Sequence, residues 1–219
     1  MSDSDANGGW KLNTIEFYCG TKSFSNVADE LGHFTWTVDI DPQFKPDVCK
    51  SIFDFNPRIY KPHNFDVLWA SVPCQGFSVA SIGKMWNHDN TPKHPTAEYG
   101  LKLLKHTIKL IEEMKPKYWF IENPRGKMRK IDCMKDYHRK TVTYCQYGDT
   151  RMKPTDIFTN LKTWNPRPMC KNGMDCHTPA PRGSPTGTQG LKGSVDRSKI
   201  PPALFYEIFE AIEKQERKK

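Results

Sequence analysis

The 219-residue sequence lacks any apolar run long enough to cross a bilayer. A spanning helix needs about 18 apolar residues, and the longest apolar stretch, Phe65–Cys74, is broken by Asp66 and Ser71. The first ten residues lack the basic and apolar regions of a signal peptide. Internal repeats and long low-complexity tracts are also missing. These absences exclude membrane, secreted, collagen-like and disordered classes, and we expect a cytoplasmic protein.

The cysteine content and the net charge further limit the class of protein to which this sequence can belong. Seven cysteines without a secretory address indicate reduced thiols rather than a disulfide framework. Lys and Arg outnumber Asp and Glu by 33 to 25, which gives a net charge of +8 and favours a polyanionic partner. The length suits one domain, and we expect a monomer.

Strand-like and helix-like segments alternate through most of the chain. Apolar, β-rich runs predict strands at 14–18, 34–40, 65–72 and 118–121. Amphipathic spacing predicts helices at 24–31, 98–115 and 201–214. This alternation predicts an α/β fold with an open, mostly parallel sheet flanked by helices.

The segments that directly follow the predicted strands hold the residues suited to chemistry, because ligands bind beyond the carboxyl ends of parallel strands. Cys74, in a Pro-Cys-Gln turn, suits a nucleophile on a rigid scaffold, although many cysteines are ordinary buried thiols. Glu122 could hold a proton on a heterocycle, or be a solvated strand-end carboxylate. Gly20 followed by Asp39 suits binding of a ribose, but the sequence lacks the three-glycine fingerprint of NAD sites.

These motifs, in this order, resemble the DNA (cytosine-5) methyltransferase family. Pro73-Cys74-Gln75 matches the family's catalytic Pro-Cys-Gln, and Glu122-Asn123 matches its Glu-Asn pair. The resemblance implies a Rossmann-like class I methyltransferase sheet and S-adenosylmethionine as cofactor. It is greatest to short, phage-type members, in which a loop-rich insert replaces the large target-recognition domain.

The resemblance also implies roles for individual residues. The implied catalytic residues are Cys74, Glu122 and Lys153. The implied cofactor-binding residues are Phe17, Tyr18, Cys19, Gly20, Ser23, Asp39, Ile40, Ser51, Ile52, Pro73, Ser198 and Lys199. The implied substrate-binding residues are Gln75, Ser78, Asn123, Arg151 and Arg182.

Three parts of the sequence depart from the family pattern. The family's Tyr-Gly and the Gln-x-Arg-x-Arg element that follows it align with 147–155, where only Lys153 keeps a charge at a position of an expected arginine. Its C-terminal Gly-Asn-[Ser/Ala]-Val-Pro segment aligns with 197–201, which differs at the first three positions. The family's third-strand Asp-Ile falls at Ser51-Ile52, or at Asp54 if the loop slips.

The composition divides the chain into two regions. Residues 1–159 and 196–219 are expected to form the catalytic domain, and 160–195 a reduced target-recognition region. The basic loop 167–192 could follow DNA phosphates or be a solvated insert. Cys170, Cys176 and His177 could approach one another, but their spacing is unusual and the sequence indicates no fourth ligand, so we predict no metal site.

The resemblance implies methyl transfer to carbon 5 of a cytosine that is flipped out of duplex DNA. Cys74 would add to C6 while Glu122 stabilises protonated N3, and 79–97 would form a mobile flap. Three alternatives stay open: modification of RNA or nucleotide cytosine, transfer of a different group from a modified cofactor that Arg197 or Lys199 would pair with, and a non-enzymatic DNA-binding module. The reduced recognition region predicts loose or very short sequence specificity.

Overall fold

The computed structural model describes residues 10–60, 64–79, 82–171, 173–179 and 193–218. Its strands are β1 (Asn13–Phe17), β2 (Phe34–Asp39), β3 (Val48–Cys49), β4 (Val67–Ser71), β5 (Tyr118–Pro124), β6 (Arg139–Thr143) and β7 (Pro154–Thr159). Its α-helices are α1 (Ser23–Glu30), α2 (Ile82–Met85), α3 (Pro95–Met114), α4 (Ser194–Ser198) and α5 (Pro202–Glu216). The four predicted strands and three predicted helices are all present, with shifts of a few residues at their ends.

The seven strands form one sheet in the order β3-β2-β1-β4-β5-β7-β6. The first five strands in this order are parallel, whereas β7 is antiparallel to both β5 and β6. The predicted α/β class with a mostly parallel sheet is therefore confirmed. Strands β3, β6 and β7 were not predicted from the sequence, because β3 is very short and β6 carries charged residues at an edge of the sheet.

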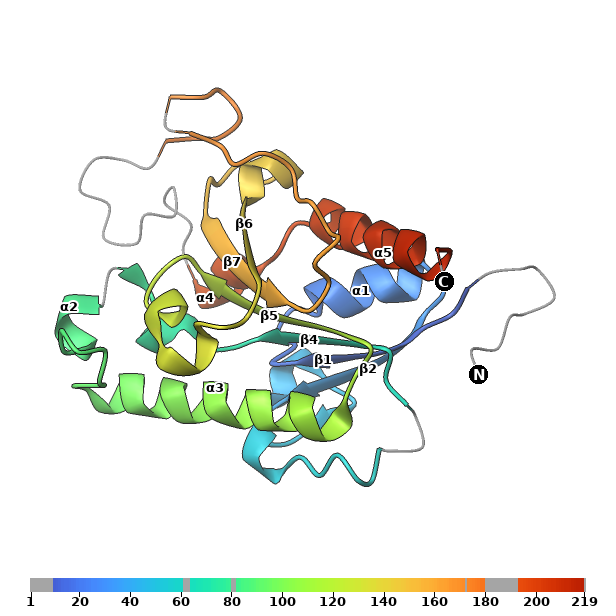
Figure 1. Ribbon diagram of the computed structural model, residues 1–219, viewed down its shortest axis with the longest axis horizontal. Helices are drawn as coiled ribbons and strands as arrows, with labels where there is room; N and C mark the ends of the chain where they lie inside the picture. Colours follow the sequence, from blue (N-terminus) through green and yellow to red (C-terminus); the bar gives the residue numbers. More distant parts are fainter. Residues whose placement is uncertain (1–9, 61–63, 80–81, 172, 180–192, 219) are drawn as a thin grey trace.

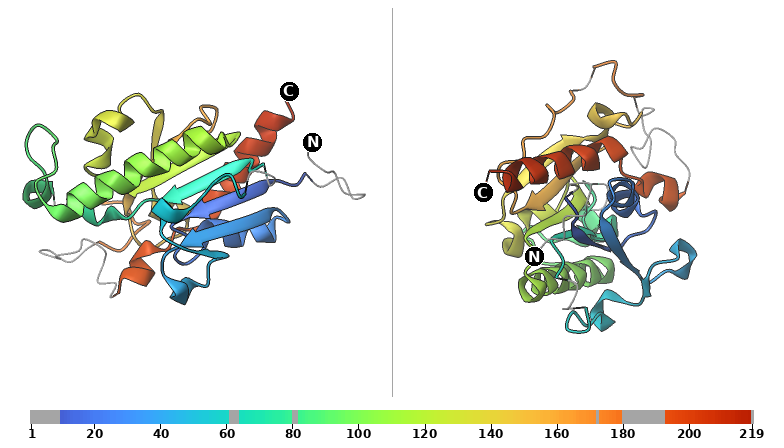
Figure 2. Two further views of the ribbon diagram at one scale, coloured as in Figure 1. Left: turned by 90° about the horizontal axis from the view of Figure 1, so that it is seen from below. Right: turned by 90° about the vertical axis from the view of Figure 1, so that its right-hand side faces the viewer.

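Helices cover both faces of the sheet (Figures 1 and 2). α3 lies on one face, and α1 and α5 pack together on the other. The buried side chains of β4 alternate between the two cores: Leu68 and Ala70 pack on the side of α3, while Val67 and Trp69 pack on the side of α1 and α5. Burial on both faces explains why this strand reads as a continuous apolar run.

The region after β7 contributes to the core more than its composition suggests. Leu161 and Trp164 are buried against α5, and the Trp164 indole donates a hydrogen bond to Glu207 at 2.9 Å. Residues 160–171 and 173–179 contain neither helix nor strand, as expected of a loop-rich segment. α4 crosses the expected boundary at residue 195. Among the described residues, no helix has both the length and the apolar character needed to span a membrane.

Two glycines permit close packing around the segment that contains Cys74. A Cβ on Gly126 would lie 2.3 Å from the carbonyl oxygen of Phe77, and a Cβ on Gly76 would lie 3.0 Å from the carbonyl oxygen of Thr96. The Lys127 amide also donates to the Phe77 carbonyl at 2.8 Å. The segment 74–77 is therefore held between α3 and the loop after β5.

We expect Gly126→Ala to displace the 74–77 segment, because the added methyl group would overlap the Phe77 carbonyl. Overpacking of this kind costs about 1–3 kcal/mol of unfolding free energy. Thermal denaturation should show a lower Tm, whereas Gly83→Ala, where a Cβ meets nothing within 4 Å, should leave Tm nearly unchanged. Equal Tm values for the two variants would contradict this account of the packing.

A buried carboxyl group holds the start of α1. Glu16 accepts hydrogen bonds from the Ser25 amide at 2.9 Å and the Ser25 hydroxyl at 2.6 Å. Burial is the main cause that raises the pKa of Glu16 to about 7, and the hydrogen bonds from Ser25 only partly oppose it. The folded state therefore binds this proton more tightly than the unfolded chain does.

The Glu16 proton makes stability depend on pH with a definite sign. Its stabilising contribution is complete below the unfolded pKa of 4.5 and is lost as the pH rises to about 7. The side chain of Glu16→Gln cannot titrate, so this variant does not lose stability through that proton. As the pH rises across this window, the unfolding free energy of Glu16→Gln minus that of wild type should therefore increase by on the order of 3 kcal/mol. Urea denaturation from pH 4 to about pH 8 measures the difference, and a constant difference would contradict the assignment.

Candidate active site

A cleft of about 360 Å³ lies at the carboxyl ends of β1, β2 and β4, beside the first turns of α3. Predicted residues that line it are Tyr18, Asp39, Ile40, Ser51, Ile52, Pro73 and Gln75. Lining residues that the sequence did not single out are Val38, Lys50, Gly76, Thr96, Tyr99, Gly100 and Leu103. The α3 residues were missed because the spacing of apolar residues along a helix identifies the face that packs on the sheet, and it does not identify the residues that face a ligand cleft.

The carboxylate of Asp39 is fixed at the rim of this cleft. One of its oxygens accepts from the Gly20 amide at 2.9 Å, and the other accepts from the Asp41 amide at 2.9 Å. Gly20 has a φ of +46°, which orients its N–H toward β2. A carboxylate has about four acceptor positions, so two stay available for hydroxyl groups of a ligand.

Several of the predicted cofactor residues do not line this cleft. Ser23 and Lys199 line a second cleft, between α1 and the chain before α5. Phe17 and Cys19 are buried. The Ser23 hydroxyl accepts from the Ile200 amide at 3.2 Å, which joins the start of α1 to the chain before α5. Ser198 is exposed, and the ammonium group of Lys199 is paired with Asp196 at 2.9 Å. Ser51 and Ile52 are in the lining, whereas Asp54 is exposed and outside it.

Cys74 follows β4 on the 3₁₀ turn η4 (Cys74–Gly76) and is exposed. Asn123, at the end of β5, is fully buried and donates from its side-chain amide to the Val72 carbonyl at 2.7 Å. The Trp86 indole donates to the Gly76 carbonyl at 2.5 Å. The turn is therefore held on both sides of Cys74.

Glu122 ends the neighbouring strand, where it pairs in register with Ser71 of β4. Its carboxyl group is buried, and it accepts from the Tyr144 hydroxyl at 3.2 Å and is also hydrogen-bonded by Ser71. Burial is the largest cause that raises the pKa of Glu122, and Lys153 opposes it. The site thus favours a protonated carboxyl group more than an exposed glutamate would.

The charged groups around Cys74 have opposite effects on its pKa. Although Cys74 as a residue is exposed, the protein atoms around its thiol group partly desolvate it, which is the main cause that raises the pKa of Cys74. The Glu122 carboxylate raises this pKa further. The cations of Lys153 and Arg197 lower it. The structure therefore brings Cys74, Glu122 and Lys153 together as predicted, and it adds Arg197 as a second cation near the thiol.

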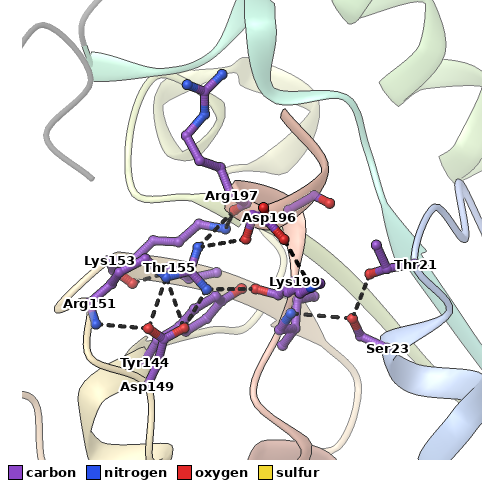
Figure 3. Close-up of polar contacts among 12 residues, drawn as sticks. Thr21, Ser23, Tyr144, Asp149, Arg151, Lys153, Thr155, Asp196, Arg197 and Lys199 are labelled. Atoms are coloured by element: carbon purple, nitrogen blue, oxygen red, sulfur yellow. Dashed lines mark hydrogen bonds and ion pairs between the residues drawn. The ribbon is translucent and has the colours of Figure 1, made fainter. Parts of the chain in front are cut away.

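Lys153 is positioned by the chain around it. Its ammonium group donates to the Arg197 carbonyl at 2.8 Å and lies 4.8 Å from the centre of the Tyr144 ring. Burial is the main cause that lowers the pKa of Lys153, while Glu122 raises it. Figure 3 shows Lys153 and Tyr144 side by side, with the Arg197 side chain directed away from the polar cluster.

The structure does not favour the predicted substrate-binding role of Arg151. Its side chain is buried and pairs with Asp149, and it donates to the carbonyls of Arg197 at 3.1 Å and Lys199 at 3.1 Å (Figure 3). A guanidinium group with these partners holds α4 and the following chain in place. Arg151 therefore positions the C-terminal segment, whereas the family resemblance implied a substrate contact.

Of the remaining predicted substrate contacts, three lie near Cys74. Gln75 is exposed on the η4 turn, Ser78 is half-buried just after it, and Asn123 holds the strand before it. Arg182 lies outside the described residues. Arg167, in the predicted DNA-contact loop, is paired with Glu207 at 3.2 Å and so anchors that loop to α5.

The predicted flap at 79–97 is anchored at Trp86. This side chain is buried and stacks on Phe77 with ring centres 5.8 Å apart. Lys127 lies over the Trp86 ring and donates to Asn90 at 2.8 Å. Residues 80–81 lie outside the described part of the chain.

Sequence reasoning missed the residues that surround Glu122. Ser71 ends the apolar run of β4, and its hydroxyl accepts from the Trp69 indole at 2.9 Å. Tyr144 begins the 3₁₀ turn η8 (Tyr144–Tyr147) and is fully buried. The break in the apolar run at Ser71 was the available signal; nothing local marked Tyr144, which approaches Glu122 only because β6 and β7 fold back beside β5.

The curated proteins that this chain resembles include two methyltransferases. The chain is 28% identical over 220 residues to a probable DNA (cytosine-5)-methyltransferase of Frog virus 3, an alignment that covers 91% of this chain and 99% of the viral one. It is 28% identical over 129 residues to the type II methyltransferase M.XorII of Xanthomonas oryzae pv. oryzae, which covers 51% of this chain and 28% of that protein.

Solved structures share the fold. A putative DNA modification methyltransferase encoded within an Escherichia coli prophage superposes with a TM-score of 0.50 at 20% identity, over 68% of this chain and 46% of that chain. The Entamoeba histolytica methyltransferase EhMeth superposes with a TM-score of 0.50 at 16% identity, over 71% of this chain and 55% of that one. The present chain thus spans about half the length of these structures, and the predicted Rossmann-like methyltransferase fold is confirmed.

The family assignment follows from the part of the chain that carries the site. The family profile described as C-5 cytosine-specific DNA methylase matches residues 12–136, which include Cys74, Glu122 and the residues around the cleft. This chain therefore belongs to the C-5 cytosine-specific DNA methylase family and is an enzyme of the methyltransferase class.

Proposed function

We propose that this protein transfers a methyl group from S-adenosylmethionine to carbon 5 of cytosine in duplex DNA. The observation that carries the proposal is the placement of Cys74, in the turn that follows β4, beside Glu122, whose buried carboxyl group of raised pKa ends the adjacent parallel strand β5 next to a ligand-sized cleft. A nucleophile and a proton donor in this relation suit addition across the C5–C6 bond of a pyrimidine.

The cleft suits an adenosine-containing cofactor. The Asp39 carboxylate has acceptor positions left for ribose hydroxyls, while Ile40 and Ile52 supply apolar surface for a purine ring. Pro73 and Gln75 line the same cleft, so a ligand there would extend toward Cys74. When bound, S-adenosylmethionine supplies a methyl group made electrophilic by a sulfonium centre.

In the first step, the Cys74 thiolate would add to C6 of cytosine. The S–C6 bond forms as the C5–C6 π electrons move into the ring, and Glu122 gives its proton to N3 so that the ring does not accumulate negative charge. The Tyr144 hydroxyl and Ser71 hold the Glu122 carboxyl in one orientation. Burial of Glu122 favours the protonated form needed at this step.

In the second step, C5 would use the displaced electron pair to form its bond to the methyl group, while the bond between the methyl group and the sulfonium sulfur breaks and leaves its electron pair on that sulfur as a neutral thioether. Solvent water would then take the C5 proton, the C5–H electrons would re-form the C5–C6 double bond, and the S–C6 bond would break to release the Cys74 thiolate. N3 would return its proton to the Glu122 carboxylate. Lys153 and Arg197 favour the thiolate form of Cys74 at the start and at the end of the cycle.

Cys74 can reach C6 only if the cytosine leaves the base stack. We therefore infer that the target nucleotide is flipped out of the duplex. The net charge of +8 favours DNA as the partner through contacts to phosphates. The cations of Lys153 and Arg197 act electrostatically on the Cys74 thiol, and they would also attract a nearby phosphate.

Cys74→Ala should abolish methyl transfer, because the proposed mechanism begins with attack of the Cys74 thiolate on C6. Duplex DNA containing 5-fluorocytosine should trap wild type in the presence of S-adenosylmethionine, since the intermediate cannot lose a proton from C5. The covalent complex is detected on denaturing gels, and its peptide is mapped by mass spectrometry.

Cys133→Ser, a thiol remote from the cleft, is the matched control and should form the same complex. Product analysis on duplex DNA, transfer RNA and dCMP distinguishes the substrate classes. Trapping through a residue other than Cys74, or retained turnover in Cys74→Ala, would overturn the proposed mechanism.

Lys153→Met should move the whole pH–activity profile to higher pH. Attack needs the Cys74 thiolate, so activity rises with pH through the pKa of Cys74; protonation of N3 needs neutral Glu122, so activity falls above the pKa of Glu122. The Lys153 cation lowers both pKa values, and its removal therefore raises both.

The profile is obtained from kcat/KM for DNA between about pH 6 and about pH 10. Lys153→Arg, which keeps the charge, should retain a profile close to that of wild type. If the Lys153→Met and wild-type profiles coincide apart from a vertical offset, the electrostatic role of Lys153 is wrong.

A further inference from the structure

Four side chains of types that can bind a metal ion lie close together, and all four follow the Cys74 turn by about 70 residues or more in the chain. They are Cys145 in η8, and Cys170, Cys176 and His177 in the turns that follow β7. Their ligand atoms all lie within 4.8 Å of one another. In Figure 1 this chain segment, coloured orange, passes over the turn that follows β6. The sequence suggested three of these ligands; the fold supplies the fourth, Cys145.

The distances match a tetrahedral zinc site. With Zn–S bonds of about 2.3 Å and Zn–N bonds of about 2.1 Å, tetrahedral ligands stand about 3.8 Å apart for two sulfurs and about 3.6 Å apart for sulfur and nitrogen. The observed separations are 3.2 Å for Cys170–Cys176 and 3.6 Å for Cys176–Cys145. The His177 Nδ1 atom lies 3.4 Å from the sulfur of Cys170 and 3.8 Å from that of Cys176.

The same distances do not suit a disulfide. Sulfur atoms in a disulfide are about 2.05 Å apart, whereas the shortest separation in this cluster is 3.2 Å. All seven cysteines of the chain are free. Cys145 and Cys170 are buried, and three thiols converging on one imidazole with no disulfide among them are unusual unless they share a ligand.

The surrounding contacts hold the ligands from outside the cluster. The Cys170 amide donates to the Thr143 hydroxyl at 2.8 Å, and the Gln146 side-chain amide donates to the Cys176 sulfur at 3.3 Å. The Thr178 amide donates to the Thr150 carbonyl at 2.8 Å. Such second-layer hydrogen bonds orient metal ligands and stabilise thiolate charge.

We propose that Cys145, Cys170, Cys176 and His177 bind one structural zinc ion. Three thiolates and an imidazole form a closed four-ligand set, which is typical of structural rather than catalytic zinc. The ion ties the segment after β7 to η8, the turn that begins with Tyr144. It therefore stabilises the region that brings the Tyr144 hydroxyl to Glu122, without taking part in methyl transfer.

The test is the metal content of the full chain, purified under reducing conditions without a polyhistidine tag. Elemental analysis should find about one zinc ion per chain in wild type. Cys145→Ser and Cys176→Ser should lose most of it, whereas Cys133→Ser and Cys74→Ala should retain it. The Cys74→Ala result separates this proposal from the proposed methyl transfer, because zinc binding should survive the loss of activity.

A spectroscopic measurement covers the case in which a ligand variant fails to fold. Wild type exchanged with Co²⁺ alone should show the intense visible and sulfur-to-metal absorption bands of tetrahedral cobalt bound to thiolates. Removal of the metal with a chelator should lower Tm.

Two results would overturn the proposal. One is wild-type protein that binds neither zinc nor cobalt after both are offered under reducing conditions. The other is a Cys170–Cys176 disulfide found by mass spectrometry in protein alkylated directly from cells.

Discussion

The active site depends on the parallel pairing of β4 with β5. This register places Glu122 beside Ser71, and the Asn123 side chain then bonds to the Val72 carbonyl. The two strands thus deliver a carboxyl group and a thiol to the same edge of the sheet. Because β4 and β5 are buried on both faces, neither strand can shift by a residue without exposing its apolar side chains. Core packing therefore fixes the geometry that the proposed reaction requires.

Burial has opposite consequences for Glu122 and Cys74, the two groups that the proposed reaction uses. It favours the neutral form of Glu122, which the proposed chemistry needs, but it also disfavours the thiolate of Cys74. The cations of Lys153 and Arg197 partly offset the cost at the thiol. Protonation of Glu122 has the same effect, because it removes the nearest negative charge. The protonation of Glu122 and the ionisation of Cys74 are therefore coupled, and each group is best suited to the proposed reaction when the other is in the form that this reaction needs.

The C-terminal third of the chain supports the site from a distance. Strands β6 and β7 continue the sheet beyond β5 and bring Tyr144 to Glu122. Arg151 binds the carbonyls around α4, which fixes the chain from which Arg197 extends (Figure 3). The proposed zinc site would hold the same region from its outer side. A segment poor in regular structure is thus kept in place by ion pairs, hydrogen bonds and the proposed metal ion rather than by apolar packing alone.

The sequence alone determined β1, β2, β4 and β5 and the helices α1, α3 and α5. It also determined that Asp39, Cys74 and Glu122 follow or end strands, because strong apolar periodicity and strand-end position are local properties. Tertiary structure decided the rest. Strands β6 and β7 have weak local patterns and form because the edge of β5 is available for pairing. Arg151 proved to be an internal anchor, since a charge does not reveal its partner. Cys145 and Cys170 lie close together only because of the fold. In the chain 24 residues separate them, and a local sequence pattern does not reveal which distant residues meet in space.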